Sequence, residues 1–392
     1  MLRAFFTPAR LVMAVFFMQA MTIANWVPRI PDVQEKLGLT PGELAIAVLG
    51  MPVGSLLALL ASGQLIERIT ARRTVFLGFL IYLAFLPLAG WAWDLASLFG
   101  ALFLLGVFSP LVDVAMNVEA ARVQESMRRP IMSTCHGFWS IGSMAGALIG
   151  SVFADAGIGT HWHLLIIACV SVPVAVAVGM ALPEVAPLPR SKGGSRLPFA
   201  LPSASMIGLV VFAFGAVMGE VAARNWSAVY LREVISASPG SAGLGYAAFS
   251  LFMAGGRFLG DWATLRFGAV RIARLCCTIA VLGMVLIVFG NSFVGVIAGF
   301  AALGFGLALV YPLSATSAAG RGDRPAALNV GALSLGAFAA FMIGPPITGF
   351  VADEWGLRAG LATVIPVIAL SVLLAGELQR RPRLRQTPRP AI

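Results

Sequence analysis

Four polar side chains lie in stretches of sequence that are otherwise apolar, and their spacing suits a helix. Asp113 and Asn117 stand four residues apart, as do Glu220 and Arg224, so each pair shares one helix face. An acid inside a membrane helix is costly and marks a candidate for proton relay or substrate binding. Glu220 and Arg224 equally fit a structural ion pair, because an arginine lowers the cost of burying an acid. Asp113 is therefore the first candidate for a group that takes up and releases a proton.

Two further side chains suit the same chemistry. His136 lies in another apolar run, and an imidazole titrates in the physiological range. Trp139 follows on the same helix face three residues later. A structural hydrogen bond from His136 to the region of Asn117 explains the histidine equally well. The other two histidines, His161 and His163, are expected in a solvated outer loop.

The composition shows which solvent surrounds these groups. Of the 392 residues, 59% are hydrophobic and 11% are charged, whereas soluble domains are about 25% charged. Apolar runs of about 20 residues, long enough to cross the hydrocarbon core of a bilayer as a helix, recur along the whole chain. The sequence therefore predicts an all-α membrane protein in contact with the lipid bilayer.

Charged residues, prolines and glycines separate twelve predicted transmembrane helices. They span residues 9–30, 43–66, 74–93, 96–120, 131–153, 163–182, 203–231, 243–263, 273–290, 293–316, 327–350 and 358–377. The first of these runs lacks a convincing cleavage site, so we interpret it as a membrane helix and not as a signal peptide.

The basic residues predict the orientation. Of the 27 lysines and arginines, 21 fall in the termini and in alternate connections, and four fall on the opposite side. Because basic residues are enriched in cytoplasmic loops, both termini are expected in the cytoplasm, with the chain in a bacterial inner membrane. This distribution also explains the net charge of +10 without nucleic-acid binding.

The connection 184–202 divides the chain into two nearly equal parts. It is rich in proline, glycine, serine and basic residues, which is typical of a linker. We expect an N-terminal six-helix bundle over 1–183, this cytoplasmic linker, and a C-terminal six-helix bundle with a basic tail over 203–392.

The two halves repeat each other. Asn25-Trp26 recurs as Asn225-Trp226 at an offset of 200, and from the second span onward the offset is 198. At that offset Ala154-Asp155 matches Ala352-Asp353. A constant register over several segments predicts two pseudo-symmetric bundles.

The loop after the second span carries a recognisable motif. Residues 63–73 read GQLIERITARR, which resembles the GxLaDRxGRR signature of the major facilitator superfamily, with Glu67 in place of Asp and Thr70 in place of Gly. The corresponding loop of the second half contains Gly260-Asp261 and then Arg266-Phe267-Gly268. It has a glycine at the repeat position of Thr70. An ordinary basic loop would also fit. We assign a gating role to Glu67, Arg68, Arg72, Asp261 and Arg266, because arginines can bind a carboxylate in one of two states of a gate.

A second resemblance concerns the fourth and fifth spans. Residues 111–119 (LVDVAMNVE) and 130–140 (PIMSTCHGFWS) resemble a bacterial subgroup that contains a rhizopine-associated transporter, and more distantly the fucose–proton symporters. In those symporters an acid precedes an Asn by four residues in the fourth helix. The resemblance implies that Asp113 is a coupling or sugar-binding carboxylate. The symporters also have an acid in the first helix, and residues 25–28 contain none.

We therefore predict a monomeric secondary transporter that moves a small polar organic solute, with a sugar favoured, by alternating access and with protons. The residues predicted to bind substrate or couple transport are Gln19, Asn25, Trp26, Arg29, Asp113, Asn117, His136, Trp139, Glu220, Arg224, Asn225, Trp226 and Tyr311. Trp26 and Trp226 equally fit interfacial belt residues. Tyr311 is included because it stands at the repeat position of Asp113.

Three alternatives remain open: a multidrug or metabolite exporter of the same fold, a channel or receptor, and an intramembrane enzyme. The sequence contains no Walker loop and no HExxH, GxSxG or paired-cysteine metal motif, so neither a metal nor a cofactor is expected.

Overall fold

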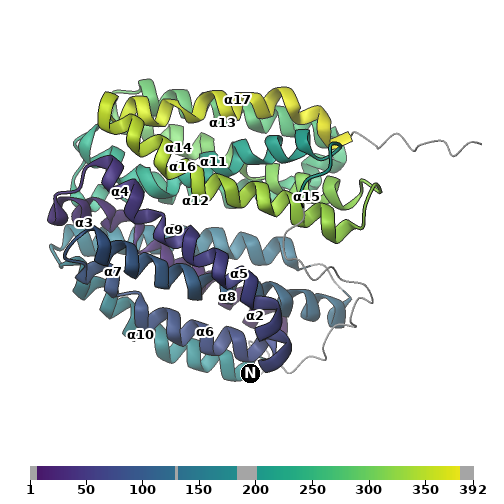
Figure 1. Ribbon diagram of the computed structural model, residues 1–392, viewed down its shortest axis with the longest axis horizontal. Coiled ribbons are helices and arrows are strands. Elements are labelled where there is room, and N and C mark those ends of the chain that lie inside the picture. The colour runs from purple at the N-terminus through teal and green to yellow at the C-terminus, as the bar shows by residue number, and fades with distance from the viewer. Residues whose placement is uncertain (1–6, 129–130, 183–200, 380–392) are drawn as a thin grey trace, which may run out of the picture.

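The computed structural model describes residues 7–128, 131–182 and 201–379, apart from the side chains of 60–67 and 327. Every regular element in these residues is helical. The helices form two bundles that lie one on the other, the purple-to-blue one below the green-to-yellow one in Figure 1.

The first bundle contains six passes, three of which bend between consecutive helices. In chain order the elements are α2 (Pro8–Ala24), η1 (Val27–Arg29), α3 (Ile30–Leu37), α4 (Pro41–Val48), α5 (Gly50–Ile69), α6 (Ala71–Phe85), α7 (Leu88–Trp91), α8 (Leu95–Met127), α9 (Met132–Asp155) and α10 (Thr160–Ala181).

The second bundle repeats this order. Its elements are α11 (Ile207–Glu233), η2 (Pro239–Ser241), α12 (Leu244–Phe267), α13 (Ala269–Phe289), α14 (Phe293–Leu307), α15 (Val310–Ala319), α16 (Ala326–Ala362), α17 (Val364–Leu374) and η3 (Ala375–Gln379). The tenth pass bends between α14 and α15, close to Pro312.

Twelve passes agree with the sequence, although hydropathy and length alone identify ten candidate spans among the described residues. One of the ten, Leu328–Gln379, contains two passes, because the backbone turns at Gly356 with φ of 80°. The helix α12 is not among the ten. It carries Arg257, Asp261 and Arg266, which lower its hydropathy.

Two loops show that the halves share local geometry as well as order. The residue between α5 and α6 is Thr70, with φ of 73° and ψ of 152°. The residue between α12 and α13 is Gly268, 198 positions later, with φ of 85° and ψ of 147°. Glycine adopts this conformation readily, whereas a β-branched residue is strained in it. Thr70 therefore occupies a backbone position that favours glycine.

Small residues bring the helices close together in both halves. A Cβ placed on Gly106 of α8 would collide with the backbone of Met51 in α5, and one placed on Gly304 of α14 with the backbone of Phe249 in α12. Both members of the second pair lie 198 positions after those of the first. Close backbone approach at small residues is a common way to pack helices in membranes.

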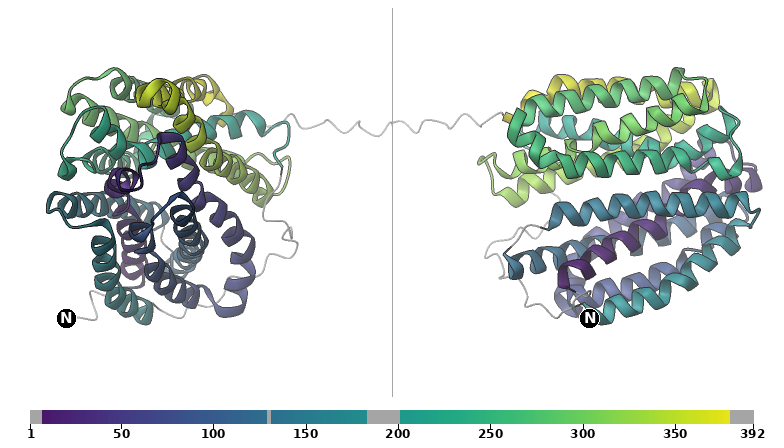
Figure 2. Two further views of the ribbon diagram at one scale, coloured as in Figure 1. Left: turned by 60° about the vertical axis from the view of Figure 1, so that its left-hand side comes forward. Right: turned by 180° about the vertical axis from the view of Figure 1, so that it is seen from behind.

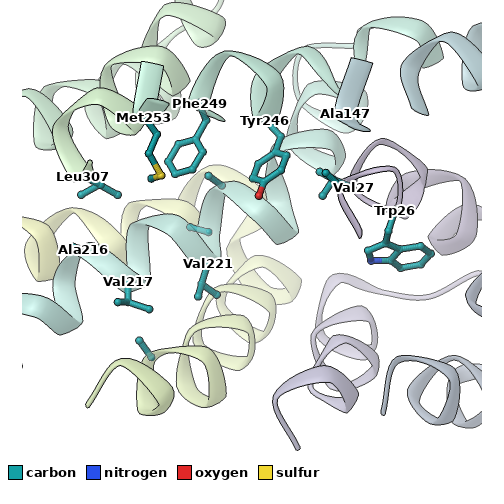
Figure 3. Close-up of a cluster of buried hydrophobic side chains, with 14 of the residues drawn as sticks. Trp26, Val27, Ala147, Ala216, Val217, Val221, Tyr246, Phe249, Met253 and Leu307 are labelled. Carbon is teal, nitrogen blue, oxygen red and sulfur yellow. The ribbon is translucent and has the colours of Figure 1, made fainter. Parts of the chain in front are cut away.

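The ends of the helices define two faces of the molecule. We call the end with η1, α3, α4 and η2 the α4 end, and the end at which α2 begins and η3 stops the termini end (Figure 2). Six passes in each bundle return the chain to the termini end. Figure 3 shows buried side chains between α11 and α12, with Tyr246 close to Val27 and Ala147 of the first bundle.

Candidate functional site

Arg224 lies at the centre of a polar group between the bundles. Its Nη2 donates to Glu220 Oε1 at 3.1 Å, one helical turn away on α11. Its guanidinium lies over the Trp139 ring of the first bundle, 5.8 Å from the centroid, and 5.7 Å from that of Phe341 in α16. Cation–π contacts of this kind hold a guanidinium in a defined orientation without neutralising it. The predicted ion pair between Glu220 and Arg224 is therefore present, and it faces the other bundle.

A hydrogen-bonded chain extends from this point into the first bundle. Trp139 Nε1 donates to Gln19 Oε1 at 2.8 Å, and Gln19 Nε2 donates to Ser109 Oγ at 3.0 Å. The chain joins α9, α2 and α8, and Gln19 is only 2% exposed. Because both functional groups of its amide are bonded, Gln19 fixes the Trp139 ring beneath Arg224.

Asp113 lies on α8 near this group. Its carboxylate has no hydrogen bond or ion pair with any described residue, and the side chain is partly accessible. It interacts electrostatically with Arg224 of the opposite bundle. Asn117 Nδ2 donates to the backbone oxygen of Asp113 at 2.8 Å, so the predicted pair shares one face. An unpaired carboxylate between two bundles is available to bind a proton or a ligand.

The structure also contains a charged residue in this region that the sequence analysis missed. Arg257 of α12 reaches across to α9, where its Nη1 donates to Ser140 Oγ at 2.8 Å and to the backbone oxygen of His136 at 3.4 Å. It interacts electrostatically with Glu220 and Tyr246. The sequence contained a signal for this residue. Once the basic residues of the termini and connections are counted, Arg224 and Arg257 are the two that remain inside predicted spans.

His136 faces α2 rather than Asp113. Its ring makes an edge contact with Phe16, with centroids 5.3 Å apart. Tyr311 lies in the second bundle, 3.3 Å from Ser334 Oγ through its hydroxyl. The His136 ring interacts electrostatically with Arg257, whereas no hydrogen bond or ion pair of the described residues joins Tyr311 to Arg224.

Five predicted residues lie toward the α4 end instead. Asn25 is fully buried, with its Oδ1 2.9 Å from His163 Nε2, and Trp26 is also buried. Arg29 pairs with Asp32 at 2.8 Å and donates to Ile158 O at 2.7 Å, all within the first bundle. Trp226 packs near Gly349 and is 1% exposed, whereas Asn225 is partly accessible.

The expectation that His163 is solvated is wrong. Its side chain has no exposed area, and it stacks on Phe153 with centroids 4.4 Å apart. The sequence showed a histidine beside a loop, but its burial depends on Asn25, 138 residues earlier, which supplies its hydrogen-bond partner.

A further set of contacts between the bundles lies at the α4 end. The Asp353 carboxylate of α16 accepts hydrogen bonds from Gly42 N at 2.9 Å and Thr40 Oγ1 at 3.3 Å, at the start of α4. A carboxylate is favoured there because the first amides of a helix are unpaired and the helix dipole is positive. Nearby, Gly243 N donates to Ser151 Oγ at 3.1 Å.

The predicted gating residues lie at the termini end. Arg72 donates through Nε and Nη2 to the last turn of α10, at Gly179 O (3.2 Å) and Met180 O (2.8 Å). Arg68, Asp261 and Arg266 are exposed. The Glu67 side chain lies outside the described residues, as does most of the predicted linker.

Comparisons with known proteins agree with this architecture. The family model "Major Facilitator Superfamily" matches residues 12–231 and 203–392. An uncharacterized transporter, y4wD, of Sinorhizobium fredii is 30% identical, and the alignment covers 97% of this chain and 100% of that protein. The membrane protein MosC of Rhizobium meliloti is 28% identical over 90% of this chain and 85% of its own length.

The fold has solved counterparts. A crystal structure of the E. coli fucose:proton symporter FucP superposes with a TM-score of 0.65 at 15% identity, over 95% of this chain and 98% of that one. The predicted resemblance to this superfamily, with its twelve-helix fold, is confirmed. The relatives are membrane transporters and not enzymes. The chain belongs to the Major Facilitator Superfamily.

Proposed function

We propose that the protein is a secondary active transporter that moves a small hydroxylated organic solute across the bacterial inner membrane, with Asp113 carrying a coupled proton. The observation that supports this most is the position of Asp113. It is an acid in mid-membrane without a described ion pair, and it faces an arginine of the opposite bundle.

The position of Asp113 couples proton binding to solute transport if the two bundles rock about it. An ionised Asp113 attracts Arg224 across the interface, and protonation removes the attraction. Proton binding on one side of the membrane thus changes the relative stability of the two states of the bundles. A solute that favours one of these states is then transported together with the proton.

The hydrogen-bonding groups beside Asp113 support a hydroxylated solute. Asn117, Glu220 and Arg224 are all partly accessible, and Trp139 offers an aromatic face. Sugars bind in such places through hydroxyl hydrogen bonds and stacking on a ring. The likeness in fold to a fucose:proton symporter agrees with this class of solute.

The direction of opening follows from the contacts between the bundles. We infer that the α4 end faces the periplasm and is closed in this structure, because Asp353, Ser151 and their partners join the bundles there. The basic residues of the termini end support a cytoplasmic location for that end.

The test uses purified protein in liposomes with a panel of radiolabelled sugars, polyols and hydrophobic cations. A transported solute should accumulate when the outside is acid, and Asp113→Asn should abolish accumulation while counterflow exchange continues. Exchange needs no net proton movement, so its survival separates coupling from binding. The matched control is Glu125→Gln, which removes an exposed acid near the termini end of the same helix.

Accumulation by Asp113→Asn at the wild-type level would contradict the coupling role. Accumulation of hydrophobic cations without any sugar or polyol would favour the multidrug exporter. Flux that never exceeds equilibrium would indicate a channel.

A further inference from the structure

Arg257 presents two different edges of its guanidinium. Nη1 is anchored to α9 by Ser140 Oγ at 2.8 Å and the His136 backbone oxygen at 3.4 Å. Nε is buried and has no hydrogen-bond partner among the described residues. Nη2 likewise makes no hydrogen bond to a described residue, and it is not fully buried. The anchored edge fixes the side chain, and the Nε–Nη2 edge is left unpaired, with Nη2 as its accessible end.

This unpaired edge matches a particular chemical group. Nε and Nη2 of an arginine carry parallel N–H bonds, which match the two oxygens of a carboxylate. Leaving a buried donor unpaired costs free energy, and a ligand that pairs it recovers that cost. Ser140 Oγ accepts from Nη1 and makes no hydrogen bond with Nε or Nη2.

The charges of the region balance Arg257 only in part, because Glu220, which attracts it, is already paired to another arginine. Glu220 pairs with Arg224 at 3.1 Å. Asp113 interacts with Arg224 rather than with Arg257. No carboxylate of the described residues forms an ion pair with Arg257. When Asp113 carries its proton, the two carboxyl groups and the two guanidinium groups named here together bear one excess positive charge.

Tyr246 lies close to both arginines of the second bundle. It interacts electrostatically with both Arg224 and Arg257. Figure 3 shows its ring and hydroxyl extending from α12 toward α11. The tyrosine hydroxyl therefore lies beside both arginines of the second bundle, and the positive charge there comes from the arginines.

We propose that the transported solute carries a carboxylate, which the Nε–Nη2 edge of Arg257 binds, so that the substrate class is a hydroxylated organic acid. This inference rests on the proposed transport function and narrows its solute. Protonation of Asp113 and binding of the anion support each other, since the proton removes the one negative charge that is not already paired.

The test compares matched compounds that differ in the carboxylate. Purified full-length protein is heated with glucose or glucuronate, and with glucitol or gluconate, over a concentration series. At least one acid should raise the unfolding temperature at a concentration about tenfold or more below that of its neutral partner. Arg257→Gln should weaken the response to that acid about tenfold or more, and Arg257→Lys should retain part of it as a point charge.

Arg271→Gln is the control, because it removes an equal charge from an exposed position on α13. It should leave the response to both acids unchanged. If Arg257→Gln does not fold, the response of Arg257→Lys decides the test, since lysine keeps the positive charge and lacks the two parallel N–H bonds of the guanidinium.

Three results would overturn the inference: equal responses to acid and neutral partner, no response to either acid, or an acid response that Arg257→Gln and Arg257→Lys leave intact. Neutral sugars that accumulate in liposomes without any acid binding would leave the transport proposal standing while this one fails. If an acid binds in a way that depends on Arg257 but no solute is transported in liposomes, this inference stands and the transport proposal fails.

Discussion

At the α4 end, Asp353 of the second bundle contacts Gly42 of the first, and Asp155 of the first bundle contacts Gly240 of the second. The two glycines stand 198 residues apart, as do the two aspartates, and each glycine follows a Thr-Pro or Ser-Pro pair. The two halves thus contribute equivalent contacts to one closure. The contact of Asp353 includes hydrogen bonds, whereas that of Asp155 is a close approach.

The middle of the molecule shows no such equivalence. The repeat position of Asp113 is Tyr311, and that of Arg257 is Leu59. The acid without an ion pair belongs to the first bundle, and the fixed arginines belong to the second. The contacts that close the α4 end involve both halves in the same way. A solute with different chemical groups at its two ends instead needs a different binding residue for each group. We infer that the repeat preserves the moving parts and that the differences mark the binding site.

The largest effect on transport is expected from variants that put a larger side chain at Gly42 or Gly240, where the two bundles meet at the α4 end. A Cβ on Gly42 would collide with Asp353, and one on Gly240 with Asp155, so Gly42→Leu and Gly240→Leu should each hold the α4 end open. Transport in liposomes should fall about tenfold or more in either variant, because about 1.4 kcal/mol of bias against closure shifts the equilibrium tenfold.

The fold must survive for this comparison to be valid, so the unfolding temperature of each variant is measured beside its transport rate. A loss in only one of the two variants would break the symmetry of the closure. Wild-type rates in both would show that the end need not close in this way.

An intermediate effect is expected at the two loops with positive φ. Thr70→Gly should raise the free energy of unfolding by about 1 kcal/mol, because relief of backbone strain exceeds the few tenths of a kcal/mol lost with the Thr70 cap. Gly268→Thr should lower it by about 1–3 kcal/mol. Chemical denaturation in detergent measures both. Opposite signs support the equivalence of the loops, and equal signs contradict it.

The smallest effect concerns Asp323, between α15 and α16. Hydrogen bonds from Ser205, Asn329 and Ser203 hold the pKa of Asp323 below its usual range. A lowered folded-state pKa gives stability that is present above the unfolded pKa, about 3.9, and is lost as the pH falls through the folded value. Asp323→Asn should therefore unfold a few degrees or less below wild type at pH 7.

That difference should shrink in strong acid. The repeat position is Glu125, which is exposed and has no described hydrogen bond through its side chain. Glu125→Gln should leave the unfolding temperature unchanged at both pH values. A difference for Asp323→Asn that does not depend on pH would contradict the electrostatic cause.

The helices were predictable because each pass leaves a long apolar run, and the repeat was predictable because it leaves identical residues at one offset. Most predicted spans end within about five residues of the observed helices, but the first and fourth stop seven residues short, at 30 against Leu37 and at 120 against Met127. Arg257 stood out in the sequence as a basic residue inside a predicted span, but its cross-bundle partner, Ser140, could not be read from the sequence. His163 was misplaced for a similar reason, because its partner Asn25 lies on another helix. Pairing across helices depends on tertiary structure and cannot be read from local sequence.

The central claim is that the two bundles rock about the polar group, so that one end opens as the other closes. Pulsed electron resonance can measure this with one spin-label pair across the α4 end, at Glu43 and Glu354, and another across the termini end, at Arg73 and Arg324. All four positions are exposed, and Cys169, the exposed native cysteine, is first replaced by serine. Gly42→Leu should lengthen the distance across the α4 end and shorten the one across the termini end. Distances that stay fixed, or that both lengthen, would contradict alternating access.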